Sequence, residues 1–289
     1  MVAIVTFFIL WAVGAIATLL REDMFSWVFT DFVVCGFVAV AFMSLVFLLA
    51  ERIKRYDLVD AAWGMTFIVI AIASFFMQRG SVFDLDLQLL VTSLVVIWGG
   101  RLTWHILKRI QATEQEDARY VELRKKWKGD VRINTYLRVY LTQAALALLI
   151  CVPVIHINLF SSNGITLFAW LGVLVWVVGF WFEVTGDKQL RDFVGKPENK
   201  GKLMTTGLWK YSRHPNYFGE LTQWWGIFII CLTTPFGLVG IIGPVLLSYL
   251  ILFVSGIPLN EKRFDGRDGW KEYQARTSAL IPLPPRKLS

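Results

Sequence analysis

Long apolar runs, separated by short polar connections, dominate the chain. The first run, residues 2–20, carries no charged side chain and is long enough to cross about 30 Å of hydrocarbon at about 1.5 Å per residue. Seven further apolar runs follow, at 25–50, 58–77, 87–104, 136–157, 165–185, 221–233 and 237–257. The pattern predicts an all-α fold, a polytopic transmembrane helical bundle of seven or eight spans that forms a single domain over residues 1–289.

Two of these runs, 221–233 and 2–20, differ from the others. The run 221–233 is the weakest, and Pro235 and Gly237 interrupt the apolar sequence that follows it, so the last two runs form either a tight helical hairpin or one long kinked helix. The first run lacks the basic start of a cleavable signal peptide, which favours an uncleaved anchor.

Lysine and arginine are concentrated on alternate connections. Four segments carry 25 of the 29 basic residues: 51–57, 105–135, 186–220 and the tail 258–289. The connections between them hold only Arg21 and Arg79. Because cytoplasmic loops of membrane proteins are enriched in Lys and Arg, we expect the basic segments and both termini in the cytoplasm.

Composition agrees with a membrane protein. Hydrophobic residues make up 56% of the chain and its 289 residues include 13 Trp, more apolar surface than a soluble core of this size buries. The net charge of +7 fits contact between the basic connections and anionic lipid headgroups. No nucleic-acid-reading motif accompanies this charge, so membrane lipids are expected partners and nucleic acid is not.

Cysteine and histidine are too scattered for a disulfide framework or a metal centre. Each cysteine lies inside an apolar run without a second one nearby: Cys35, Cys151 and Cys231. The histidines are equally dispersed, and the topology places the second at the outer surface: His105, His156 and His214. We therefore predict no metal site.

Ionisable residues at the membrane boundary are the first candidates for function, because an unpaired charge there is costly. Asp57 and Asp60 lie at the cytoplasmic start of the run 58–77. Alternatively, either carboxylate caps the helix or is solvated.

A second candidate set is Glu183, Asp187 and Arg191, whose spacing of four residues puts them on one stripe of a helix leaving the run 165–185. The structural alternative is an intrahelical ion pair between Asp187 and Arg191, which stabilises a helix by only about 0.2–0.5 kcal/mol.

The richest polar stretch is 207–220. Pro215 suits the first turn of a helix, on which Asn216 and Glu220 face the same way. A helix start that also carries Arg213 and His214 is suited to an anion or a nucleotide. The tail after the last run, 260–282, is amphipathic, and its structural alternative is a headgroup-bound interfacial helix.

Several short motifs follow one another along the chain: Asp60-Ala-Ala-Trp-Gly, Trp98-Gly-Gly-Arg101-Leu-Thr, Glu116-Asp117-Ala-Arg119-Tyr120, Asp187-Lys-Gln-Leu, Gly207-Leu-Trp, Arg213-His-Pro-Asn-Tyr-Phe-Gly-Glu220, Ser255-Gly-Ile-Pro258, and Tyr273 with Thr277 and Ile281-Pro282. With them, the chain resembles the membrane-embedded steroid 5α-reductase-like proteins, in the bacterial branch catalogued as DUF1295. The resemblance runs from about residue 55 to the end and leaves out the first span.

The resemblance implies an NADPH-dependent reductase of a carbon–carbon double bond conjugated to a carbonyl in a lipid or steroid-like substrate. It implies a bacterial inner-membrane protein whose cofactor cavity opens to the cytoplasm, where Arg would meet the phosphates and an amide or carboxylate the nicotinamide carboxamide. The predicted cofactor-binding residues are Asp117, Arg119, Glu183, Asp187, Arg191, Arg213, His214, Asn216, Tyr217, Glu220, Arg263, Tyr273 and Arg276.

For the chemistry, hydride addition to an enone builds negative charge on the carbonyl oxygen, so a hydrogen-bond donor must lie there. The resemblance matches the family glutamate with Asp60, which donates only if burial keeps it protonated, and the family tyrosine with Trp98, whose indole N–H donates but transfers no proton. Tyr120 is the third predicted catalytic residue.

Two other functions stay open. Isoprenylcysteine and phospholipid methyltransferases have a similar Arg-His-Pro helix start and use S-adenosylmethionine, although Asn216, Glu220 and the motif 116–120 favour the reductase branch. The second alternative is a non-catalytic lipid-binding protein, which neither nucleotide would stabilise.

Overall fold

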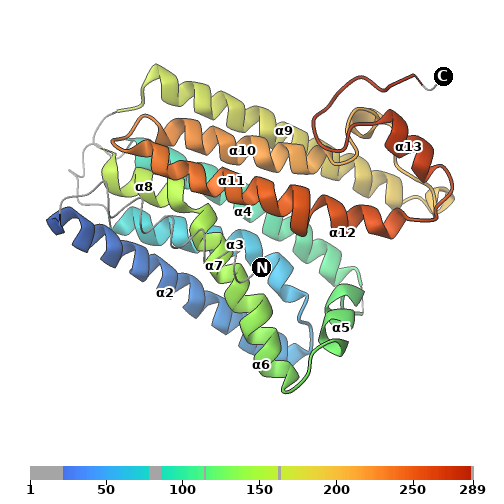
Figure 1. Cartoon of the computed structure of the whole chain (residues 1–289), viewed down its shortest axis with the longest axis horizontal. Helices are drawn as coiled ribbons and strands as arrows, with labels where there is room; N and C mark the ends of the chain where they lie inside the picture. Colours follow the sequence, from blue (N-terminus) through green and yellow to red (C-terminus); the bar gives the residue numbers. More distant parts are fainter. Residues whose placement is uncertain (1–21, 78–85, 114, 162–163, 288–289) are drawn as a thin grey trace. The chain divides into compact units, whose positions relative to one another are not determined.

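The computed structural model describes residues 22–77, 86–113, 115–161 and 164–287, and within these ranges the chain is helical, with no β-strand (Figure 1). An isolated parallel bridge joins Ser212 and Ser278. The predicted first span, 2–20, lies outside the described residues. The chain divides into two compact units, one reaching Thr166 and including Cys231–Gly243, the other formed by Leu167–Ile230 and Pro244–Ser289.

The first unit contains the helices of the N-terminal half and one short helix from later in the chain. They are α2 (Glu22–Ile53), α3 (Leu58–Phe76), α4 (Asp86–Gln111), α5 (Ala118–Lys125), α6 (Val131–Thr135), the π-helix η1 (Tyr136–Tyr140), α7 (Leu141–Ile150), α8 (Val152–Phe160) and η4 (Gly237–Ile241).

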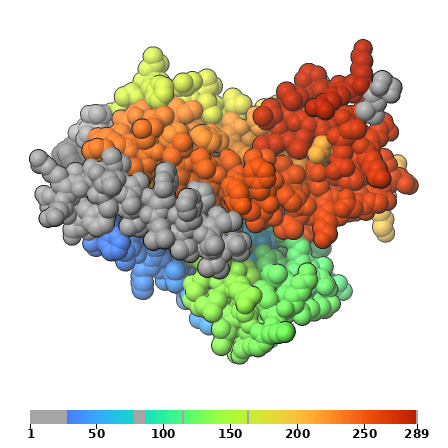
Figure 2. All heavy atoms as spheres, viewed as in Figure 1, coloured from blue at the N-terminus to red at the C-terminus, as the bar shows by residue number. Residues whose placement is uncertain are grey.

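The second unit contains the C-terminal helices. They are α9 (Leu167–Val194), η2 (Pro197–Asn199), η3 (Gly207–Lys210), α10 (Pro215–Cys231), α11 (Ile242–Tyr249), η5 (Leu250–Val254), α12 (Ile257–Glu261), η6 (Lys262–Phe264) and α13 (Trp270–Arg276). The last residue of α10, Cys231, and the first two residues of α11, Ile242 and Gly243, belong to the first unit. In the space-filling view the C-terminal segments of the second unit are coloured red (Figure 2).

Six helical segments among the described residues are long and apolar enough to cross a membrane: Val28–Ile53, Leu58–Phe76, Asp86–Gln111, Val131–Ile150, Leu167–Val194 and Gly237–Phe264. The predicted all-α transmembrane bundle is therefore confirmed. The weak run 221–233 lies mostly in α10, which has 17 residues and falls short of the roughly 20 that a perpendicular span needs.

The break after α10 separates two helices. The helix ends at Cys231, and η4 begins at Gly237 after Phe236, which has a left-handed backbone with φ of 57°. Pro235 lacks the N–H that a continuous helix would use. Of the two alternatives for this region, one long kinked helix is thus wrong.

Close helix packing in the first unit depends on glycine. A Cβ added to Gly99 of α4 would lie 2.6 Å from the Gly64 carbonyl oxygen of α3, so the two backbones meet where neither residue has a side chain. Small residues allow such contacts between membrane helices. Beside this crossing, the Trp98 ring meets the Phe67 ring edge-on at 5.2 Å.

In the second unit, three glycines at seven-residue spacing bring α9 against α10 (Figure 1). A Cβ on Gly172 would lie 2.6 Å from Ile230, one on Gly179 would lie 2.6 Å from the Gly219 carbonyl oxygen, and one on Gly186 would lie 3.2 Å from the Asn216 nitrogen. Seven residues are nearly two helical turns, so the glycines share one face of α9. This face positions the polar groups described next.

Candidate functional site

Asp60, in the first turn of α3, lies at the centre of a charged cluster in the first unit. Its carboxylate accepts a hydrogen bond from the Arg119 guanidinium at 2.6 Å and another from the Tyr120 hydroxyl. The Arg109 guanidinium is 3.7 Å away. The side chain of Asp60 is 16% exposed, so the cluster is only partly buried.

Tyr120 reaches Asp60 because α5 begins just before it. Asp117 caps α5 by accepting a hydrogen bond from the Arg119 backbone N–H at 2.9 Å. The side chain of Tyr120 is 8% exposed. Burial, followed by the adjacent Asp60 charge, raises the pKa of Tyr120 well above its usual value of 10, so the phenol keeps its proton at neutral pH.

Asp57 has a different role, which is to join two connections of the first unit. It occupies the N-cap position of α3 without a side-chain cap bond. Its carboxylate instead receives the Arg55 guanidinium through two hydrogen bonds of 3.0 Å and the Asp117 backbone N–H at 3.1 Å. Glu116 reinforces the junction, since it accepts from the Tyr56 N–H at 3.1 Å and pairs with Arg124.

Trp98 packs in the core of the first unit. Its side chain is 2% exposed and meets Phe67, which in turn meets Trp63 edge-on at 4.9 Å. Edge-on aromatic pairs stabilise a core beyond the area they bury. Its predicted catalytic role remains a prediction.

Two amide–carboxylate pairs lie along the contact between α9 and α10. Asn216 donates from Nδ2 to Asp187 Oδ1 at 3.0 Å, and Gln223 donates from Nε2 to Glu183 Oε2 at 2.5 Å. Both carboxylates are buried, Glu183 at 3% exposure and Asp187 at 8%. The predicted stripe is therefore divided: its two acids face α10, whereas Arg191 is exposed and lies 3.6 Å from Asp192.

Arg213 and His214 connect the start of α10 to the C-terminal tail. The Arg213 guanidinium donates to Glu261 at 2.7 Å, to the Gln274 carbonyl at 3.1 Å and to the Thr277 carbonyl. His214 Nε2 lies 3.2 Å from the same Glu261 oxygen. The motif thus anchors the tail, and the predicted contact of these two residues with a cofactor remains a prediction.

Tyr273 belongs to the same anchor. Its hydroxyl donates to the Trp209 carbonyl, and the Trp209 indole donates to the Gly186 carbonyl at 3.1 Å. Burial raises the pKa of Tyr273 above its usual value, with the Arg213 charge opposing the shift and the Glu261 charge adding to it. A neutral phenol at this position keeps α13 joined to η3.

The remaining predicted cofactor residues differ in exposure. Tyr217 receives a hydrogen bond from the Asn260 amide, and Glu220 is half-buried on α10. Arg263 and Arg276 are exposed, and Arg276 lies 3.3 Å from the exposed Glu272. Arg is a preferred partner of phosphate oxygens, and the predicted contact of these two residues with a cofactor remains a prediction.

Three contributors were missed by the sequence analysis. Gln223 lies among apolar residues of α10, where nothing distinguishes it from a surface amide. Glu261 and Gln274 complete the Arg213 anchor. The string Asn260-Glu-Lys-Arg263, directly after an apolar run, was the available signal for Glu261.

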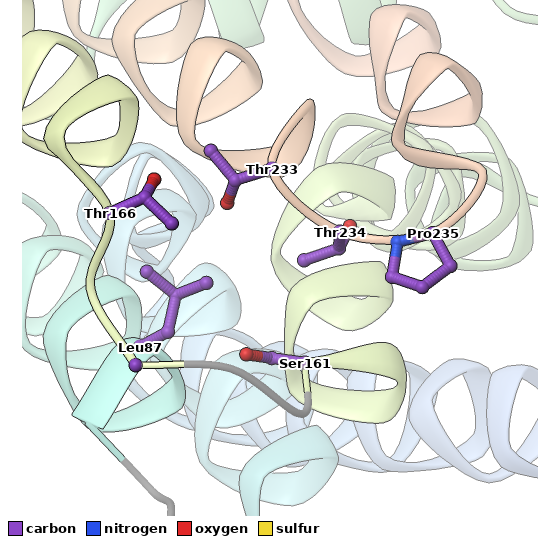
Figure 3. Close-up of a pocket in the computed structure, with 7 residues that line it drawn as sticks. Leu87, Ser161, Thr166, Thr233, Thr234 and Pro235 are labelled. Carbon is purple, nitrogen blue, oxygen red and sulfur yellow. The ribbon is translucent and has the colours of Figure 1, made fainter.

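The first unit also contains a depression (Figure 3). Its lining consists of Leu87, Ser161, Gly164, Thr166, Thr233, Thr234 and Pro235. Ser161 accepts a hydrogen bond from Gln88 at 3.0 Å, and nearby Asn158 bonds Ser74, which is 14 residues or about 21 Å along α3 from Asp60. The lining holds no charged side chain, so it does not suit a dinucleotide.

His156, expected at the outer surface, is buried beside this depression. It is 8% exposed and its Nε2 lies 2.7 Å from the Pro235 carbonyl. The hydrogen bond gives the ring a partner within the fold, and the expected place of His156 on the outer side of the membrane remains a prediction.

A family model matches most of the chain, and a named relative matches a short segment of it. The family model described as "Protein of unknown function (DUF1295)" matches residues 46–277. A protein named steroid 5-alpha-reductase DET2, from Gossypium hirsutum, is 38% identical over 55 residues, which are 19% of this chain and 21% of that relative. The matched segment is therefore about a fifth of the length of the relative. No solved structure matches.

Proposed function

The chain belongs to the DUF1295 family, and from that premise we propose that it is an NADPH-dependent reductase of a carbon–carbon double bond conjugated to a carbonyl in a lipid, such as a 3-oxo-steroid or an isoprenoid enone. The short similarity to a protein named steroid 5-alpha-reductase supports this reaction class. The observation that carries the proposal is the hydrogen bond from the neutral Tyr120 phenol to Asp60.

This pair supplies the donor that enone reduction needs. When hydride adds to the β-carbon, negative charge develops on the carbonyl oxygen, and a nearby O–H stabilises it. In the observed arrangement Asp60 is the acceptor, so the donor role passes to Tyr120. When the hydroxyl turns toward a substrate, Asp60 retains Arg119 as its partner. The proton that completes the reduction passes from Tyr120 to the substrate and ends on the α-carbon of the saturated product, and water then restores the phenol.

The second unit fits the cofactor by its chemistry. NADPH, when bound, supplies the hydride. Asn216 uses its amide N–H on Asp187 and leaves Oδ1 without a hydrogen-bond partner within the described chain, an acceptor suited to a carboxamide or a ribose hydroxyl. The exposed guanidinium groups suit its phosphates: Arg191, Arg263 and Arg276.

Thermal stability of the purified chain in detergent tests the cofactor assignment. NADPH at a hundred times its Kd should stabilise the fold by about 2.7 kcal/mol. Asn216→Ala and Arg276→Ala should remove most of that shift while the ligand-free melting temperature of Arg276→Ala stays unchanged. Lys200→Ala, which also removes one exposed positive charge, is the matched control.

The two alternatives give different results in the same assay. Stabilisation by S-adenosylmethionine and not by NADPH would assign the chain to the methyltransferases. Stabilisation by neither nucleotide would leave the non-catalytic lipid-binding role and refute the proposal.

A further inference from the structure

Gln223 lies deeper in the second unit than any other amide described above. It is 0% exposed, and Glu183, on the facing helix α9, is 3% exposed. A carboxylate in a buried, membrane-embedded position is costly unless hydrogen bonds or opposite charges surround it. The Gln223 amide provides such a bond at 2.5 Å, and it does so without adding charge.

Backbone packing limits where this pair can move. A Cβ on Gly219 would lie 2.8 Å from Glu183 Cβ, and one on Gly179 would lie 2.7 Å from the Gln223 nitrogen. The glycines therefore let the two helices approach so closely that the side chains of Glu183 and Gln223 meet end to end. Repacking around either side chain would require the helices to separate.

The hydrogen bonds of Gln223 also fix the orientation of its side-chain amide. Gln223 Nε2 donates to Glu183 and to the Gly219 carbonyl at 3.3 Å, which uses both of its N–H groups. Its Oε1 is buried and has no hydrogen-bond partner in the described chain. An inverted amide would place this oxygen against the carboxylate, so the observed orientation is the one that holds Glu183.

We propose that Gln223 is a positioning residue, which fixes the Glu183 carboxylate for cofactor binding by the second unit, one helical turn along α9 from Asp187, the partner of Asn216. This inference rests on the proposed function. It differs from the role of Asn216, because Gln223 is fully buried and acts only through Glu183.

The first test is Gln223→Met, which keeps the length of the side chain and removes its hydrogen bonds. The NADPH Kd, measured by fluorescence of the full-length protein in detergent, should rise roughly ten- to a hundredfold, as for a lost hydrogen bond to a charged group. The matched control is Thr222→Val on the same helix, because the Thr222 hydroxyl donates to the Phe218 carbonyl one turn earlier on α10. Its Kd should equal that of the wild type.

The second test exchanges the pair, Glu183→Gln with Gln223→Glu, which retains an amide–carboxylate bond and moves the charge from α9 to α10. If Gln223 positions Glu183, the exchanged variant should melt without ligand closer to the wild-type temperature than either single variant does. Its Kd for NADPH should stay raised. Wild-type affinity in the exchanged variant, or in Gln223→Met, would show that the pair is purely structural.

A wrong cofactor assignment would give a different set of binding results from a wrong positioning role. The wild type and Thr222→Val would then bind no NADPH, and the positioning role would fall together with the cofactor assignment. Normal binding by the wild type with normal binding by Gln223→Met would overturn the positioning role alone.

Discussion

At the scale of single residues, the hydroxyl of Tyr120 is the group on which the proposed chemistry depends. Tyr120→Phe removes the donor to Asp60 and keeps the ring, so the rate of NADPH-dependent enone reduction should fall about 10²–10⁴-fold, the usual cost of lost general acid catalysis. The melting-temperature shift with NADPH should persist. The decrease in NADPH absorbance with a 3-oxo-Δ4 steroid or an isoprenoid enone measures the rate.

Asp60→Asn tests how far the Asp60 carboxylate positions Tyr120, which is the proposed proton donor. Asn still accepts a hydrogen bond from Tyr120 but no longer pairs with the Arg119 charge, so the loss of rate should be smaller than in Asp60→Ala. Tyr211→Phe, at an exposed tyrosine, is the control. Normal turnover of Tyr120→Phe would remove the phenol from the mechanism.

Tyr56 gives the fold a dependence on alkaline pH. Burial and the hydrogen bond to Glu51 raise the pKa of Tyr56 to about 12, from the model-compound value of 10.0 that applies to the unfolded chain. The raised value means that the folded state holds the proton more tightly, so this stabilisation is complete below pH 10 and is lost between pH 10 and 12. Tyr56→Phe should therefore be less stable than wild type at pH 8, with a difference that shrinks above pH 10.

Melting curves of both proteins from pH 8 to 11 measure this difference. The other tyrosines are present in both proteins, so their contributions cancel in the difference between the two melting temperatures. Curves that remain parallel over the whole range would show that Tyr56 and Glu51 do not interact in solution.

At the scale of helices, the contact between α9 and α10 depends on missing side chains. Gly179→Ala and Gly219→Ala should each lower the free energy of unfolding by about 1–3 kcal/mol, because the new Cβ would overlap the facing backbone. Gly100→Ala in α4 is the control, since no atom outside its local helix lies within 4 Å of a Cβ there. Thermal unfolding in detergent should show a decrease for the first two only, and equal melting temperatures would refute the close contact.

The C-terminal tail is the second helix-scale feature. Arg213→Met should cost about 3 kcal/mol, because it leaves Glu261 without its guanidinium partner in a mostly buried position. The tail should then exchange amide hydrogens faster over α13. Arg213→Lys keeps the charge without the fork geometry and should be intermediate. Lys271→Met, on the exposed face of α13, should exchange like wild type, and unchanged exchange in Arg213→Met would refute the anchor.

At the scale of the whole molecule, the distribution of basic residues predicts the topology. The three native cysteines are buried, so single added cysteines can be labelled against a low background. Lys128→Cys should react only from the cytoplasmic side, and Thr166→Cys only from the outer side. Reaction of both positions from one side would refute the predicted assignment of the basic segments to the cytoplasm.

The sequence alone determined the helical membrane fold, because each span is a local property of continuous apolar residues. It also located several polar groups of both units, from Asp60 to Arg276, since charge at a membrane boundary is conspicuous in any sequence. The break after Cys231 needed the structure, because Pro235 and Gly237 fit both a hairpin and a kink.

Only the tertiary structure decided which side chains meet. Tyr120 reaches Asp60 across 60 residues, and Gln223 reaches Glu183 across 40. Such pairs depend on the rotation of each helix about its axis and on how closely two backbones approach, which here depends on Gly179 and Gly219. Neither quantity is a property of any single segment. The physical reason is that side-chain contacts between helices are set by packing, whereas the spans themselves are set by transfer from water to lipid.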